Sequence, residues 1–203
     1  MLAGFSATWD WYAVEQDKKR IEYIAKPATT LCIFLAAFSM LSDHDTRRAF
    51  VIVGLAFCLL GDVFLMLPRD RFVFGLASFL VAHVLFIAGF VLDEPRHTPI
   101  LTMILALPFA LVVLPRVLRA VRATEPKFFA PVLVYAIAIL AMFMASGFTG
   151  HSLAIAGAAV FVASDTLIAW NRFVRPLPHG QLAIMTTYHA ALVLLVVSLA
   201  QIG

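Results

Sequence analysis

The chain has 203 residues, of which 63% are apolar and only 13% are charged. An ordinary soluble domain is about 45–50% apolar and about 25% charged, so this composition argues against a soluble enzyme, a disordered segment and a nucleic-acid-binding protein. The net charge of +3 comes from Lys and Arg between apolar blocks, where they set the orientation of a membrane protein. The predicted partner is therefore the lipid bilayer, with no nucleic acid.

Residues 1–20 are rich in Trp and Tyr and are interrupted by acidic side chains, which predicts an interfacial segment and not a span. Seven blocks of about 20 mostly apolar residues follow, the length that crosses a bilayer as a helix. They are 21–42, 49–67, 72–92, 98–118, 128–147, 151–171 and 181–202. Because the connections are short, residues 21–203 are predicted to form a single all-α transmembrane helix bundle.

The basic residues indicate the orientation of this bundle. Of the 15 Lys and Arg residues, 12 fall in the N-terminal segment and the second, fourth and sixth connections, and 3 fall on the other side. Cytoplasmic loops carry the excess of positive charge. The N-terminus is therefore predicted to be cytoplasmic, and the expected location is the plasma membrane of a bacterium.

Two acidic residues, Asp62 and Asp165, lie well inside predicted spans. A carboxylate at membrane depth costs about 2.5–3.5 kcal/mol on insertion scales, so such a residue is by default a candidate for function. A hydrogen bond to a neighbouring helix, made for packing alone, is the alternative interpretation. We therefore take Asp62 and Asp165 as the candidate catalytic residues.

The surroundings of the two aspartates are alike. Arg69 and Arg172 each follow an aspartate by seven residues, which is about two helical turns, or about 10 Å, along the same face. Both spans are predicted to run toward the cytoplasm, so both carboxylates lie in the cytoplasmic half beneath a basic rim. Other polar residues in or near this half are Lys26, His83, Tyr135, Ser164, Tyr188 and His189.

Motifs of several other chemistries are missing from the sequence. The spans contain no His or carboxylate pair at i,i+4 spacing for zinc, and the chain has neither Gly-x-Ser-x-Gly nor a Gly-rich phosphate loop. We therefore predict neither a metal nor a cofactor. A buried carboxyl pair can keep one member protonated as a general acid while the other is ionised, which suits reactions through an oxocarbenium-like cation. A basic rim suits a phospholipid headgroup.

Several short motifs together resemble the YhhN-type lysoplasmalogenase family. They are Lys26-Pro27 at the start of a span, Gly61-Asp62 followed by Leu67-Pro68-Arg69, His83 in the next span, and Ser164-Asp165 late in the chain. The resemblance runs from about residue 25 to the end. It implies a multi-pass hydrolase that cleaves the vinyl ether of lysoplasmalogens, with ethanolamine or choline headgroups, to a fatty aldehyde and a glycerophospho-alcohol. Family members are described with eight spans, so an eighth span is an alternative to seven.

The resemblance and the residues together suggest a division of roles. Asp62 and Asp165 would act as proton donor and as the carboxylate that stabilises the cation or orients water, in an order left open. The residues expected to hold the phosphate are Lys26, Arg69 and Arg172. The residues expected to position water or the ether oxygen are His83, Tyr135 and Tyr188, with Ser164 and His189 as further supporting residues.

Two other functions stay open at this point. Intramembrane carboxylates also serve as ion sites, so a proton-coupled transporter is the main alternative. A metal-dependent lysolipid amidase or esterase is the second, and it predicts an activity that disappears with a chelator.

Overall fold

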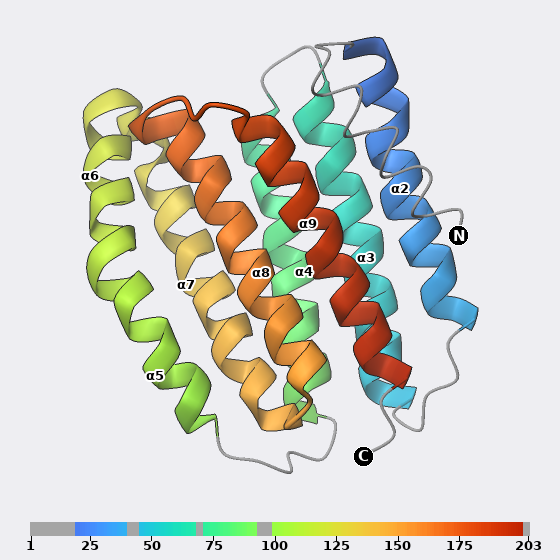
Figure 1. Cartoon of the computed structure of the whole chain (residues 1–203). Coiled ribbons are helices and arrows are strands. Elements are labelled where there is room, and N and C mark those ends of the chain that lie inside the picture. Colours follow the sequence, from blue (N-terminus) through green and yellow to red (C-terminus); the bar gives the residue numbers. More distant parts are fainter. Residues whose placement is uncertain (1–18, 40–44, 68–70, 93–98, 201–203) are drawn as a thin grey trace.

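The computed structural model describes residues 19–39, 45–67, 71–92 and 99–200, and it describes residues 19–26 and 45 by their backbone alone. The regular elements in these ranges are all helices (Figure 1). Residues 1–18 of the predicted interfacial segment, 1–20, lie outside the described residues. Among the described residues the first helix begins at Lys19, two residues before the start predicted for the first span.

The described helices run in alternating directions from one span to the next. They are α2 (Lys19–Ser39), α3 (Asp45–Met66), α4 (Phe72–Leu92), α5 (Ile100–Pro108), α6 (Leu114–Thr124), α7 (Phe129–Ser146), α8 (Ser152–Ala169) and α9 (Gly180–Val197). Of these, α5 and α6 belong to the same span. A π-helical turn, η1 (Phe109–Val113), joins α5 to α6, and a second, η4 (Trp170–Val174), continues α8. The short 3-10 turns η2 (Pro126–Phe128), η3 (Gly147–Thr149) and η5 (Ser198–Ala200) extend α7 and α9.

The described helices confirm the prediction of a polytopic membrane bundle. Six are long and apolar enough to cross a bilayer, and they are Thr46–Met66, Phe72–Leu92, Ile100–Thr124, Pro126–Thr149, Ser152–Val174 and Gly180–Ala200. The first predicted span, 21–42, corresponds to α2, whose apolar part over the described side chains, Pro27–Ser39, is shorter. The second span begins at Asp45, four residues before the predicted start.

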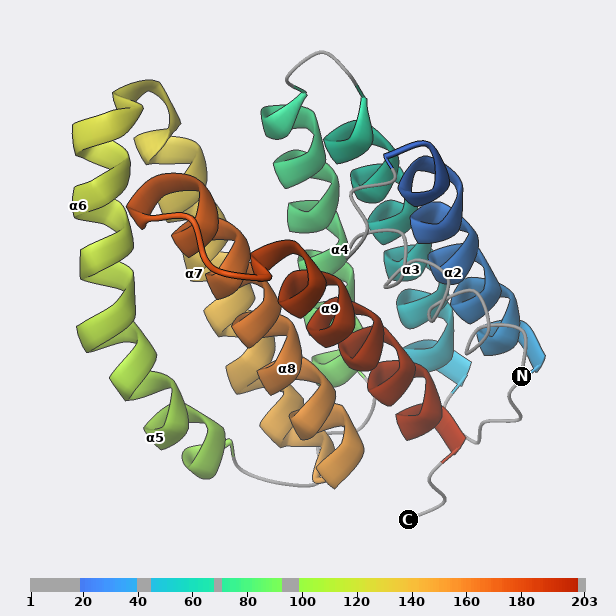
Figure 2. The same cartoon turned by 45° about the horizontal axis from the view of Figure 1, so that its top comes forward.

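Six of the helices form a closed ring. In order around the ring, α2, α3, α4, α7, α8 and α9 each contact the next, and α9 contacts α2 (Figures 1 and 2). The α5–α6 span lies outside this ring, against α7 and η4. Because the chain alternates in direction, α3 and α8 end where α4, α7 and α9 begin, at the top of Figure 1. We call this the α6–α7 end, after the connection that it contains.

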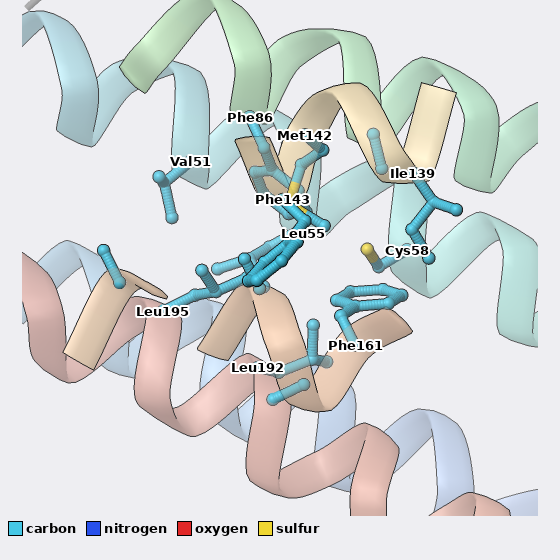
Figure 3. Close-up of a cluster of buried hydrophobic side chains, with 14 of the residues drawn as sticks. Val51, Leu55, Cys58, Phe86, Ile139, Met142, Phe143, Phe161, Leu192 and Leu195 are labelled. Carbon is cyan, nitrogen blue, oxygen red and sulfur yellow. The ribbon is translucent and has the colours of Figure 1, made fainter. Parts of the chain in front are cut away.

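Side chains from all six helices of the ring fill its interior. Leu55, Cys58, Phe86 and Phe161 are completely buried there, and Figure 3 shows Cys58 and Phe161 facing one another across this core. On the outside, by contrast, large apolar side chains are exposed, and Leu111 of η1 is 72% accessible. Soluble monomers rarely expose contiguous apolar surface on this scale. The outer surface is therefore the one that meets lipid.

The closest helix contact in the ring is the seam between α3 and α4. A Cβ atom added at Gly54 would lie 2.5 Å from the ring of Phe86, and one added at Gly61 would lie 2.6 Å from the ring of Phe79. Small residues allow helices in a membrane to approach closely. At this seam the two glycines let two phenylalanine rings of α4 lie directly on the backbone of α3.

Candidate active site

Asp62 lies four residues before the end of α3 and is completely buried. Its Oδ2 atom accepts a hydrogen bond from the Thr30 hydroxyl of α2 at 2.7 Å and another from the Tyr188 hydroxyl of α9 at 2.8 Å. The carboxyl group thus ties three helices of the ring together. Two hydroxyl donors on one oxygen also offset part of the cost of burying the carboxyl group.

Asp165 lies four residues before the end of α8 and is half-buried. The Tyr135 hydroxyl of α7 donates a hydrogen bond to its Oδ2 atom. Asp165 and Tyr135 line two small apolar pockets on either side of α7, with volumes of about 50 and 40 Å³. The larger pocket lies between α4, α7 and α8, and its other walls include Leu76 and Phe79. We call it the Asp165 pocket.

The two aspartates therefore differ in access. Asp62 is not among the residues that line these pockets in the described part of the chain, whereas Asp165 lines both. The sequence predicted two different roles for these carboxylates but left their order open. The structure gives one that faces open space and one that is enclosed by hydroxyl groups.

Aromatic rings connect the two carboxyl groups across the interior of the ring. The buried ring of His83 packs edge-on against Tyr135 and Phe161, with centroid separations of 5.2 and 4.9 Å. Phe161 in turn packs edge-on against Tyr188 at 5.8 Å. The tyrosine partners of the two aspartates are thus separated by His83 and Phe161.

A basic and aromatic cluster covers the α6–α7 end of the Asp165 pocket. The guanidinium of Arg172, on the π-helical turn η4, lies 4.0 Å from the ring centroid of Phe72 and 5.4 Å from that of Phe173. Both phenylalanines also line the pocket. Arg172 forms an ion pair with Glu125 at 3.5 Å, and its side chain is 29% exposed. The cation is therefore held at the rim of the pocket, where part of its side chain is exposed.

The remaining predicted residues are distributed as follows. The Ser164 hydroxyl donates to the carbonyl of Ile184 at 3.2 Å. This hydrogen bond joins α8 to α9 and involves neither Asp165 nor Asp62. His189 is buried and packs against Tyr188 with a centroid separation of 5.5 Å. Arg69 and the side chain of Lys26 lie outside the described residues.

Two residues of the site were missed by sequence reasoning. Thr30 donates to Asp62 and follows Lys26 by four residues, so it lies about one helical turn beyond the Lys26-Pro27 motif. That spacing could have indicated it. Glu125 lies between the basic residues of α6 and Lys127 in the sequence, and an acid within such a run could have indicated an ion pair.

The chemical capacity of the site is that of carboxyl and hydroxyl groups. Among the described residues, no group of three or more His, Cys, Asp and Glu side chains is placed to surround a metal ion. What the described site offers is a half-buried carboxyl group with a tyrosine donor, a second enclosed carboxyl group, and a cation at the pocket rim. These groups can donate protons, stabilise positive charge and bind an anion.

Comparisons with known proteins show which proteins this chain is similar to. The family model of the YhhN family matches residues 21–199. Lysoplasmalogenase TMEM86B of Sus scrofa is 33% identical over 177 residues, which cover 86% of this chain and 73% of the relative. The Homo sapiens protein of the same name is 34% identical over 176 residues, which cover 86% and 74%.

A shorter match joins the chain to bacterial proteins. The uncharacterized membrane protein YhhN of Escherichia coli O157:H7 is 30% identical over 99 residues, which cover 49% of this chain and 45% of the relative. No solved structure matches the chain. The family model covers most of the chain, and this confirms the resemblance carried by its short motifs: the protein belongs to the YhhN family.

Proposed function

We propose that this protein is a lysoplasmalogenase, which hydrolyses the vinyl ether bond of lysoplasmenyl-ethanolamine or lysoplasmenyl-choline to a fatty aldehyde and a glycerophospho-alcohol. Relatives that bear this name match at about one-third identity over most of the chain. The observation that carries the proposal is Asp165, a carboxyl group inside a membrane bundle that lines an apolar pocket and is held by Tyr135.

The reaction needs an acid and a way to stabilise a cation. A proton is transferred to the β-carbon of the vinyl ether, and the π electrons form the new C–H bond. The α-carbon and the ether oxygen then share the positive charge of an oxocarbenium ion. Water adds to the α-carbon and loses a proton to a carboxylate, giving a hemiacetal, which collapses to the aldehyde and the free alcohol. Carboxyl pairs serve glycosidases in the same way, because their transition states carry the same charge.

The different access of the two aspartates supports different roles. Asp165 lines the pocket, so it is the residue that can contact the vinyl ether and donate the proton. Asp62 is enclosed and accepts two hydroxyl hydrogen bonds, an arrangement that suits a carboxylate. Its negative charge would stabilise the cation through the low-dielectric interior. Tyr135 would fix the orientation of Asp165, and Tyr188 would fix that of Asp62.

The basic rim gives the substrate a direction. Arg172 would bind the phosphate of the headgroup, since a guanidinium makes strong hydrogen bonds with phosphate oxygens. In a lysoplasmalogen the vinyl ether lies just below the headgroup. Seven residues, about 10 Å along a helix, separate Arg172 from Asp165. This separation is suitable for a phosphate at the rim and a vinyl ether at the carboxyl group.

The deciding experiment offers the purified protein a vinyl-ether lysolipid and the acyl-ester lysolipid with the same headgroup, and measures aldehyde and fatty acid. We expect aldehyde from the vinyl ether and no fatty acid from the ester, in the presence and absence of a chelator. Fatty acid from the ester, or loss of activity with the chelator, would support a metal-dependent esterase. No product from either lipid would support the proton-coupled transporter.

A further inference from the structure

A larger apolar groove lies on the outer surface of the ring between α4 and α7. Its volume is about 350 Å³, within the range of small-molecule sites. The lining residues are Val73, Leu76, Ala77 and Leu80 of α4 and Ala130, Pro131, Val134 and Tyr135 of α7. Val73 and Val134 are 44% and 53% exposed, so the groove opens on the surface that meets lipid. We call it the α4–α7 groove.

The groove adjoins the Asp165 pocket. Leu76 and Tyr135 line both spaces, so these two side chains form the wall between them. The hydroxyl of Tyr135 donates to Asp165, on the inner side of this wall. A chain that lay in the groove and passed between Leu76 and Tyr135 would therefore reach the carboxyl group directly.

Chemistry and position limit what the groove can hold. Seven of its eight lining residues have hydrocarbon side chains, and Tyr135 is the eighth. A charged or strongly polar headgroup would lose its hydration there without gaining hydrogen bonds. The groove follows the first turns of α4 and of α7, at the same end of the bundle as Arg172. A single hydrocarbon chain therefore fits the groove while the headgroup stays at the rim.

We infer that the α4–α7 groove is the lateral entry and binding site for the single hydrocarbon chain of the substrate, which reaches Asp165 from the bilayer by passing between Leu76 and Tyr135. This inference rests on the proposed function and adds the route and the chain site to it. Because lipid tails are as apolar as the groove, transfer into it releases little hydrophobic free energy. The groove would act by shape, holding the more distant carbons of the chain so that the first carbons lie beside the carboxyl group.

Two alanines allow the groove to be filled. Ala77 of α4 and Ala130 of α7 are both exposed and both line it, so Ala77→Phe and Ala130→Phe should occupy its space without disturbing the core. Ala190→Phe is the matched control, since Ala190 is exposed on α9 and lines neither the groove nor the Asp165 pocket. Thermal unfolding in detergent should be the same for all three variants.

The kinetic test compares a long-chain vinyl-ether lysolipid with a short-chain, water-soluble one. For the long chain we expect kcat/KM to fall about tenfold or more in Ala77→Phe and Ala130→Phe, as for a pocket too small for its ligand. For the short chain, kcat/KM should stay close to that of the unsubstituted protein, as it should for both lipids in Ala190→Phe. An equal loss for both chain lengths, or no loss for either, would overturn the inference while leaving the vinyl-ether activity established.

A binding test separates the inference from the proposed function. A single-chain alkyl-ether lysolipid with a diazirine on its chain resists hydrolysis and reports its position by crosslinking. We expect crosslinks within residues 73–80 and 130–135, and their loss in Ala130→Phe but not in Ala190→Phe. Crosslinks at these sites in a protein that cleaves no vinyl ether would support the chain site and refute the hydrolase. Crosslinks distributed evenly over the exposed helices would refute the chain site.

Discussion

At the scale of single residues, the site is built by hydroxyl groups that approach carboxyl groups from other helices. Thr30 and Tyr188 reach Asp62 from α2 and α9, and Tyr135 reaches Asp165 from α7. Removing one partner of a buried hydrogen bond costs about 1–3 kcal/mol, because the other partner is left without compensation. These hydrogen bonds would also be expected if both aspartates had a purely structural role. Asp165, however, also lines the Asp165 pocket, whereas Asp62 is not among its lining residues, and this is what favours chemistry at Asp165.

The proton-donor role of Asp165 predicts the effect of an isosteric substitution. Asp165→Asn keeps the shape of the side chain but cannot donate an acidic proton, so kcat for aldehyde release should fall about 10²–10⁴-fold. The KM should change much less, since Arg172 and the pocket walls are unaltered. Ser164→Ala is the control on the same helix, because its hydroxyl bonds the Ile184 carbonyl, and it should retain nearly full kcat. Full turnover by Asp165→Asn would eliminate this residue as the acid.

At the scale of elements, the α3–α4 seam links packing to the site. Gly54 and Gly61 lie two turns apart on α3 and each accepts a phenylalanine ring of α4. The rings differ in what lies behind them. Phe86 packs against Phe161 and His83 in the core, whereas Phe79 lines the Asp165 pocket and packs against Tyr188 at 5.8 Å. The α3–α4 seam thus supports the core at Gly54 and the candidate active site at Gly61.

Substituting the two seam glycines should separate stability from catalysis. Gly54→Ala and Gly61→Ala each overpack the seam, which typically costs about 1–3 kcal/mol, so both should unfold at lower temperature in detergent. Gly61→Ala should in addition lower kcat/KM for the vinyl-ether lysolipid, because Phe79 has to move away from the pocket wall. If Gly54→Ala and Gly61→Ala lost activity equally, Phe79 would have no specific role in the site.

A buried arginine fixes the other end of the ring. Arg47 near the start of α3 is fully buried, and its Nη2 atom donates to the carbonyl and hydroxyl oxygens of Ser198 at 2.7 and 2.9 Å. Sequence reasoning placed Arg47 in an outer loop, because the second span was predicted to begin at residue 49. The helix begins earlier, at Asp45, and this carries the arginine inside, where it holds η5 at the end of α9.

Loss of this contact should destabilise the bundle without changing the reaction. Arg47→Met keeps the length and apolar stem but leaves the acceptors of Ser198 unpaired, a loss of about 1–3 kcal/mol. Unfolding in detergent should shift to lower temperature, while kcat measured well below that temperature should be unchanged. Arg116→Met is the control, since Arg116 is exposed and bonds a carbonyl of its own helix. A fall in kcat without loss of stability would argue for a role of Arg47 in catalysis.

At the scale of the whole molecule, composition is enough to predict the bundle but not the neighbours within it. Apolar runs of span length are required by the thickness of the bilayer, and a carboxylate among them is conspicuous because it is costly. Hydropathy is the same for a helix inside the ring and for the α5–α6 span outside it. Thr30 was missed because a threonine in a helix can bond its own backbone, as Thr187 does here. Which hydroxyl turns to a carboxylate depends on packing between helices.

The predicted orientation of the whole molecule in the membrane determines from which side of the bilayer the protein takes its substrate. Twelve basic residues on one side predict that the α6–α7 end, with Arg172 and Glu125, faces the cytoplasm. Thr124→Cys at this end and Ser152→Cys at the opposite end are both exposed positions for a membrane-impermeant maleimide. In intact cells only Ser152→Cys should react, and Thr124→Cys should react after lysis, with the unsubstituted chain giving the background of Cys32 and Cys58. The reverse pattern would place the headgroup site in the outer leaflet, and the substrate would then be met from outside the cell.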